Sequence, residues 1–295
     1  MTMPAYLRLY KHALESIFSH LNLSELARIS ATCRDWSAAV DSMCPIGALA
    51  GRWNLCSMSA SRLVRHVSEI CIYSRLIKAS DDLSSLCNII KQSKSLTSVI
   101  LNLNDIDTEG AYAIAEAIAQ SKSLTTVNLG WNSIRNDGAF AVAKAITQSQ
   151  SLTSVYLISN SISDFGAIVL AEAIKQSQSL TSVNLRRNYI GPIGAAAIAE
   201  AIKQSQLLTT VHLGWNSIKD DGASAIAEAI KQSKSLVSVE LNNNQIGDVG
   251  ATALAEAIKQ SQSLTNVNLS RNSIGAVCAA AIIEALKQSK SPTTQ

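Results

Sequence analysis

The 295-residue sequence has no uninterrupted apolar run near the roughly 18 residues that a membrane-spanning helix needs. Its first residues, Met-Thr-Met-Pro-Ala-Tyr, lack the basic and apolar segments of a secretory signal peptide. The net charge is only +3, and 16% of the residues are charged against 47% that are hydrophobic. These features predict a cytoplasmic protein with an ordinary hydrophobic core.

Cysteine pairs with the spacing of metal or redox motifs are also missing. The six cysteines show no Cys-x-x-Cys spacing, and five of them precede the regular part of the sequence. In a reducing cytosol such residues are more often buried thiols than disulfide partners or metal ligands. We therefore expect buried thiols at Cys33, Cys44, Cys56, Cys71, Cys87 and Cys278.

Motifs for catalysis are absent as well. The four histidines form no His-x-x-x-His pair, and no Walker or Gly-x-Gly-x-x-Gly loop occurs. Polar residues recur at fixed phases of a repeat, so their proximity follows from architecture and does not indicate acid–base chemistry. The sequence predicts a protein that is not an enzyme and needs no cofactor and no metal.

What the sequence does have is a 28-residue period. Near-copies of the phrase Leu-Thr-x-Val-x-Leu-x-x-Asn-x-Ile open at Leu96, Leu124, Leu152, Leu180, Leu208, Leu236 and Leu264. The alternation predicts short strands in which residues such as Val127 and Leu129 point inward while Asn128 points outward. Repeats of this length stack into solenoids, which usually act by binding.

An asparagine closes each phrase at a constant offset. Its amide can satisfy buried backbone groups where the chain leaves the strand, so we expect a structural role and no ligand contact. These ladder asparagines are Asn104, Asn132, Asn160, Asn188, Asn216, Asn244 and Asn272.

The second half of each unit predicts an amphipathic helix. In the unit from Gly222, the residues Ala223, Ile226, Ala227 and Ile230 fall on one stripe that can pack onto the strands. Carboxylates near the helix starts are expected to cap free backbone amides. They are Asp137, Asp164, Asp220, Asp221 and Asp248.

This combination of strand phrase and full helix within 28 residues resembles the ribonuclease-inhibitor class of leucine-rich repeat. The resemblance implies an α/β fold, a right-handed horseshoe with parallel strands on the concave face and helices on the convex face. It covers residues 67–291, with an irregular opening unit at 67–95 and seven regular units from residue 96. Residues 292–295 are a tail outside the repeats. Such arcs host many partners, so the fold alone names no ligand.

Residues 1–66 break the period and are expected to form a separate helical head. The order Ile-Phe-Ser-His-Leu-x-Leu-Ser-Glu-Leu, followed by Cys-Arg-x-Trp, resembles an F-box, the module that docks substrate receptors onto the Skp1 subunit of cullin ubiquitin ligases. By this resemblance the candidates for the docking or packing surface are Leu9, Ile17, Leu21, Leu23, Leu26 and Trp36.

The head also allows a second interpretation. F-boxes carry Leu-Pro just before the first helix, where this chain has Leu9-Tyr10. A repeat array needs a cover over its open N-terminal end, and the apolar helices of the head can serve as that cap alone.

Function is expected where the repeats differ from one another. The column just before the ladder asparagine holds Leu103, Trp131, Ser159, Arg187, Trp215, Asn243 and Arg271. Trp131 and Trp215 are three units apart, about 14 Å at the usual spacing of parallel strands, and Tyr156, Arg186 and Arg187 fall between them. Either these tryptophans anchor a partner protein, or they pack on their neighbours and stiffen the arc.

The first alternative gives a concrete candidate surface. The concave residues predicted to bind a partner are Trp131, Tyr156, Arg186, Arg187, His212, Trp215, Glu240, Asn243 and Arg271. The basic residues Arg186, Arg187 and Arg271 favour a partner with an acidic patch. Helical Lys and Arg are balanced by Glu, so no nucleic acid is expected.

Two functional hypotheses follow. The arc is a stand-alone binder that occludes or inhibits one protein, or it presents a substrate while the head recruits a Skp1–cullin ubiquitin ligase. The near-identical repeats beside a eukaryotic-looking head resemble the leucine-rich-repeat effectors that intracellular bacteria such as Legionella deliver into host cytosol. A more remote hypothesis is stimulation of a GTPase by Arg135, which is expected in a strand-to-helix loop.

Overall fold

A computed structural model of the chain describes residues 68–72 and 80–289. Within these ranges eight parallel strands alternate with eight helices, and the strands pair in chain order. The strands are β1 (Glu69–Cys71), β2 (Ser98–Ile100), β3 (Thr126–Asn128), β4 (Ser154–Tyr156), β5 (Ser182–Asn184), β6 (Thr210–His212), β7 (Ser238–Glu240) and β8 (Asn266–Asn268). The helices are α4 (Ser80–Gln92), α5 (Thr108–Gln120), α6 (Arg135–Gln148), α7 (Asp164–Gln176), α8 (Pro192–Gln204), α9 (Lys219–Gln232), α10 (Asp248–Gln260) and α11 (Ala276–Ser289).

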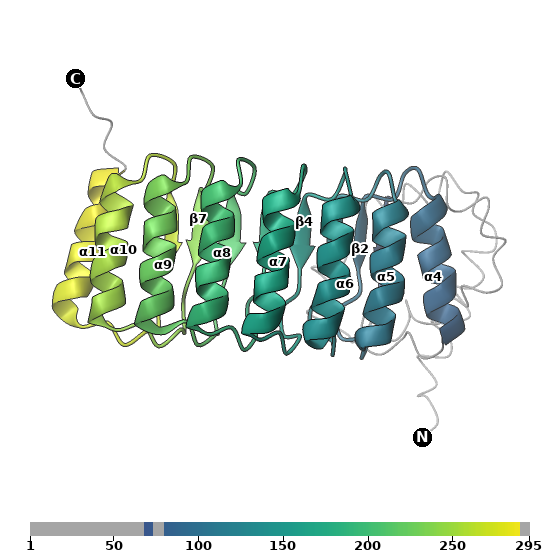
Figure 1. Ribbon diagram of the computed structural model, residues 1–295, viewed down its shortest axis with the longest axis horizontal. Helices are drawn as coiled ribbons and strands as arrows, with labels where there is room; N and C mark the ends of the chain where they lie inside the picture. Colours follow the sequence, from purple (N-terminus) through teal and green to yellow (C-terminus); the bar gives the residue numbers. More distant parts are fainter. Residues whose placement is uncertain (1–67, 73–79, 290–295) are drawn as a thin grey trace, which may run out of the picture.

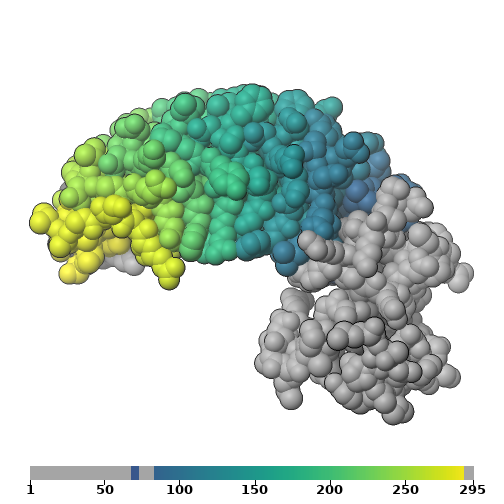
Figure 2. All heavy atoms as spheres, turned by 90° about the horizontal axis from the view of Figure 1, so that it is seen from below, coloured from purple at the N-terminus to yellow at the C-terminus, as the bar shows by residue number. Residues whose placement is uncertain are grey.

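The helices and the strands form two layers. Figure 1 shows the helices side by side in front of the strands, and Figure 2, turned by 90°, shows the described units as an arch. Packed helices lie about 8–10 Å apart whereas neighbouring strands lie about 4.8 Å apart, so the stack bends towards the strands. The predicted leucine-rich-repeat solenoid, with strands inside and helices outside, is confirmed.

The core lies between the two layers and repeats with the sequence. The inward-facing strand residues Val127 and Leu129 are at most 1% exposed, and the same holds for the predicted helical stripe of Ala223, Ile226, Ala227 and Ile230. Small alanines let neighbouring helices approach closely, which is why the same Ala-Glu-Ala-Ile phrase serves in unit after unit.

The ladder asparagines connect successive units through the backbone. The Oδ1 atom of Asn188 accepts hydrogen bonds from the backbone N–H groups of Asn160 and Ile162, both at 3.0 Å. Its Nδ2 atom donates to the backbone oxygens of Leu157 at 2.9 Å and Leu185 at 3.0 Å. The predicted structural role of these asparagines is therefore confirmed, and each one ties its own unit to the unit before it.

Carboxylates cap the helix of the following unit. The Oδ1 atom of Asp220, in the first turn of α9, accepts the backbone N–H groups of Gly247 at 2.7 Å and Gly250 at 3.0 Å, at the start of α10. Asp164 and Asp248 bond to the next unit in the same way. The other predicted caps, Asp137 and Asp221, are exposed, and their carboxylates make no hydrogen bond to another described residue.

The terminal units are less well covered than the inner ones. In the last unit Val267, Leu269 and Ile274 are partly exposed, whereas the corresponding residues of the preceding unit are fully buried. No further described unit packs beyond them. Burial was predicted for Cys71 and Cys278, and this prediction is wrong: Cys71 on β1 is exposed, and Cys278 on α11 is only half-buried. Both residues lie in terminal units, where a neighbouring described unit is missing on one side.

The prediction of buried thiols holds for Cys87. This residue is buried in α4, and burial raises the pKa of its thiol above the ordinary value, so the thiol stays protonated near neutral pH. Cys33, Cys44 and Cys56 lie outside the described residues.

The ladder predicts a large effect of one amide on stability. Replacing Asn188 by Ala leaves buried backbone groups of two units without partners, which we expect to cost about 3 kcal/mol or more of unfolding free energy. Asn184→Ala, in the same unit, removes a single local bond to the N–H of Arg186 and should cost about 1 kcal/mol. Urea unfolding followed by circular dichroism compares them, and equal midpoints for the two variants would contradict the proposed role.

Candidate functional site

The candidate residues lie at and just beyond the C-terminal ends of the strands. Tyr156, His212 and Glu240 are the last residues of β4, β6 and β7. The column that begins with Leu103 lies further along, in the loops that lead to the next helices. We call this edge of the arc the inner rim, and define it as Tyr156, Arg186, His212, Glu240 and the column Leu103, Trp131, Ser159, Arg187, Trp215, Asn243 and Arg271.

Every residue of the column has the same unusual backbone conformation. Their φ angles lie between 51° and 61°, the left-handed region that bulky residues seldom adopt. The conformation is imposed by the repeat: the N–H of Trp131 donates to the oxygen of Ile158, and that of Arg187 to the oxygen of Gly214, each in the following unit. Since one turn recurs in each unit, the side chains of the column form a single row whose identity is free to vary.

Within this row Arg187 lies between the two tryptophans. Its Cζ atom is 5.1 Å from the ring centroid of Trp131 and 4.7 Å from that of Trp215. The rings are thereby closer to each other than the spacing of their strands predicts. Each contact is a cation–π interaction of about 0.5–2 kcal/mol, so this cluster of three side chains is organised before any partner arrives.

The two sequence-based interpretations of the tryptophans are compatible in this geometry. Both rings pack on a neighbour along the rim, as the stiffening interpretation holds. Trp131 nevertheless remains 44% exposed, and Arg187 is an exposed residue as well. The cluster is therefore rigid and still presents aromatic and cationic surface.

The other predicted residues form one further pair. His212 Nδ1 lies 3.0 Å from Glu240 Oε2, which joins β6 to β7 on the concave face. Tyr156, Arg186 and Asn243 are half-buried on the same rim. Arg271 belongs to the last unit, three strands from Arg187, so the predicted basic trio does not form one patch.

A hollow beside the cluster contains a residue that sequence reasoning missed. The hollow has a volume of about 330 Å³ and is lined by Ser159, Ser161, Arg187, Asn188, Tyr189 and Trp215. Tyr189 is 71% exposed. The available signal was its position directly after a ladder asparagine, where the other regular units carry Asp, Ser or Gln.

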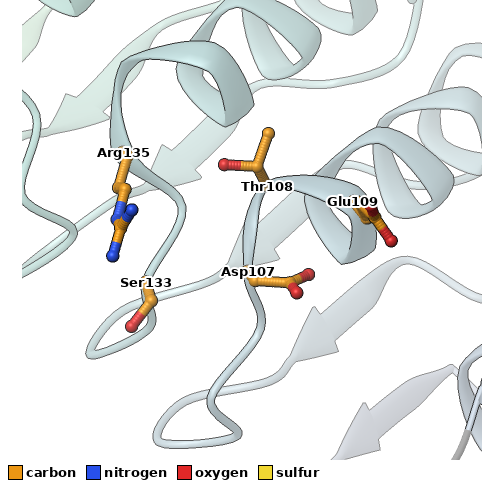
Figure 3. Close-up of a pocket in the computed structure, with 5 residues that line it drawn as sticks. All are labelled: Asp107, Thr108, Glu109, Ser133 and Arg135. Atoms are coloured by element: carbon orange, nitrogen blue, oxygen red, sulfur yellow. The ribbon is translucent and has the colours of Figure 1, made fainter.

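Arg135 lies in a separate hollow of about 350 Å³ together with Asp107, Thr108, Glu109 and Ser133. In Figure 3 the guanidinium of Arg135 points away from the carboxylates of Asp107 and Glu109, and no ion pair joins them. Asp107 instead accepts the N–H of Gly110 and caps its own helix α5. A role of Arg135 in GTPase stimulation stays a prediction.

The helical side of the arc is less uniformly charged than the sequence suggested. Pairs such as Lys203–Glu200 are present, at 2.7 Å. Exposed apolar side chains lie among them on helices α5 to α8, namely Tyr112, Phe140, Phe165, Ile168 and Ile193. The arc therefore has two surfaces with exposed aromatic residues, the inner rim and this outer patch.

Among residues 68–72 and 80–289, no three His, Cys, Asp or Glu side chains are placed to hold a metal ion. No helix in that part of the chain is both long and apolar enough to span a membrane. The candidate docking residues of the head, Leu9, Ile17, Leu21, Leu23, Leu26 and Trp36, lie outside the described residues.

Two families have models that match segments of the chain. Residues 7–46 match the F-box domain. Five segments match the Leucine Rich repeat family, at residues 92–115, 120–143, 176–199, 204–227 and 232–255. Both families are protein-binding modules, and no catalytic family is matched. No curated protein matches the chain in sequence.

Several solved structures match the chain at low identity. Leiomodin-1 Actin-Binding Site 2 is 17% identical, covers 59% of this chain and 86% of its own, and has a TM-score of 0.40. The tropomodulin C-terminal domain of Caenorhabditis elegans is 18% identical over 70% and 93%, with a TM-score of 0.35. The TLR13–ssRNA13 complex is 14% identical over 75% and 35%, with a TM-score of 0.46.

The cluster predicts a spectroscopic effect that can be measured without a partner. The chain has four tryptophans, and each gives one indole N–H signal in a ¹H–¹⁵N spectrum. Arg187→Leu removes the cation between two rings, so the signals of Trp131 and Trp215 should both shift. Arg271→Leu, in the same row but in contact with neither ring, should shift neither, and unchanged indole signals in Arg187→Leu would exclude the stacked arrangement.

Proposed function

We propose that this F-box and leucine-rich-repeat protein is a substrate adaptor, whose head docks Skp1 of a cullin ubiquitin ligase while its inner rim holds the protein to be ubiquitinated. The observation that carries the proposal is the F-box match at residues 7–46, which precedes the repeat array in the same chain. Such a head gives the arc a second partner, which a binder acting alone does not need.

The inner rim is suited to holding a protein. Its side chains vary from unit to unit on a backbone that does not, so the surface can be specific without loss of the fold. Trp, Tyr and Arg bury much area and keep a polar group, which is why they dominate the binding energy of many interfaces. A preorganised cluster such as Trp131, Arg187 and Trp215 also loses little side-chain freedom on binding.

The charge of the rim supports a partner with an acidic patch. Arg186 and Arg187 are consecutive and give this part of the rim its basic character, whereas Arg271 lies apart in the last unit. Charge complementarity of this kind mainly speeds encounter and fixes orientation. We place the activity in the cytosol, where a Skp1-containing ligase would meet its substrates.

A second candidate function is a binder that covers the working surface of its partner without a ligase. The departure at Leu9-Tyr10, where F-boxes carry Leu-Pro, favours this alternative. It agrees with the resemblance to bacterial effectors that act in host cytosol. Both functions use the same rim, and they differ in whether the head binds Skp1.

Association with purified Skp1 separates the two functions. The adaptor proposal expects the full chain to bind Skp1 with a dissociation constant of about 1 μM or tighter, measured by isothermal titration calorimetry. Leu21→Ala/Leu26→Ala should weaken binding at least about tenfold, because the F-box resemblance places these leucines on the docking or packing surface.

The rim variant Trp131→Ala/Trp215→Ala is the matched control. It removes two large side chains from the repeats and should bind Skp1 within about twofold of the unmodified chain. If the unmodified chain shows no heat of binding with Skp1, the adaptor function is wrong and the stand-alone binder remains.

A further inference from the structure

We infer that Arg187, held between Trp131 and Trp215, receives a carboxylate side chain of the protein that the inner rim binds. The inference rests on the proposed function and deepens it, because it names the chemical group that this part of the rim recognises. It also assigns a role to the hollow beside the cluster.

The position of the guanidinium is already fixed. Trp131 comes from two units before Arg187 and Trp215 from one unit after it, so the rings approach from opposite sides of the row. The unit between Trp131 and Arg187 carries the small Ser159 in the row, and this leaves space for the arginine to reach back to the more distant ring. A guanidinium restricted in this way needs little further ordering when a ligand binds.

The N–H groups of this guanidinium have no acceptor in the described part of the chain. No carboxylate forms an ion pair with Arg187 within residues 68–72 and 80–289. Aromatic rings attract a cation but do not satisfy its five N–H donors, which lie in the guanidinium plane. Those donors remain available at the edge of the group.

Two carboxylates of the surrounding units are already engaged. Glu240 lies 3.0 Å from His212, and Asp164 accepts the N–H groups of Gly191 at 2.6 Å and Gly194 at 2.8 Å. Neither is free to turn towards Arg187 without losing these bonds. The anion that pairs with Arg187 is therefore expected to come from the partner.

The hollow supplies further donors beside the guanidinium. Ser159, Ser161 and Tyr189 line it together with Arg187, and each carries a hydroxyl group. Asn188 also lines it, but its amide is fully used in the ladder. A carboxylate here would meet a guanidinium and hydroxyl donors, with no competing anion lining the hollow.

A carboxylate fits this arrangement better than other anions of proteins. Its two oxygens match the planar fork of a guanidinium, and its single negative charge equals the single charge of Arg187. A phosphoryl group carries a charge near −2 and is usually met by a cluster of arginines. No further cation lines the hollow, since Arg187 is the one basic residue among those that form it.

The test uses degenerate peptide pools that share one fixed central residue, and the full chain as receptor. Pools centred on Asp or Glu should bind at least about tenfold more tightly than pools centred on Asn or Gln. Arg187→Lys keeps the charge but loses the planar fork, so this preference should fall to about threefold or less. Arg271→Lys, in the same row, should leave the preference unchanged.

Three outcomes would overturn the inference. The first is a preference that survives in Arg187→Lys, and the second is tighter Arg187-dependent binding of phosphoserine-centred pools than of Asp or Glu pools. The third is no binding of any pool by a chain that still binds Skp1. That last result removes the carboxylate site while the adaptor function stands, so the two failures can be told apart.

Discussion

The hydrogen bonds of the ladder asparagines are the constraint on which the rest of the structure depends. Each of these amides satisfies backbone groups of its own unit and of the unit before it, at the point where the chain leaves a strand. Buried backbone groups without partners are costly, so this position tolerates little change. The side chain of the residue just before the asparagine can vary from unit to unit, because backbone hydrogen bonds hold its turn and the side chain projects from the rim.

Much of the fold could be predicted from the sequence because the fold is periodic. The 28-residue phrase carries the strand, the asparagine and the helix in fixed order, and the buried positions repeat with it. The same reasoning failed in the terminal units, which lack a neighbouring described unit on one side. Cys71 and Cys278 were expected to be buried, but Cys71 is exposed and Cys278 is only half-buried. The caps were recognised as caps, but a pattern within one unit did not reveal that Asp164, Asp220 and Asp248 act on the next one.

The candidate site was less predictable, because it arises from contacts between residues that do not repeat. The sequence pointed to both tryptophans and to Arg187 as unusual members of one column. The stack itself depends on the length of the arginine side chain and on the small Ser159 in the intervening unit, and no pattern of spacing encodes that combination. Tyr189 does not belong to the variable columns before the ladder asparagine, because it occupies the position directly after it, and those columns therefore did not predict it.

Binding is assigned to the inner rim, although the outer patch also exposes aromatic residues. One measurement separates these two surfaces directly. A photo-crosslinking amino acid is placed in the full chain at Tyr189 on the rim or at Phe165 on helix α7, and the bound protein is identified by mass spectrometry. If the inner rim is the binding surface, the partner protein crosslinks from position 189 and not from position 165. A crosslink from position 165 together with none from position 189 would contradict this assignment.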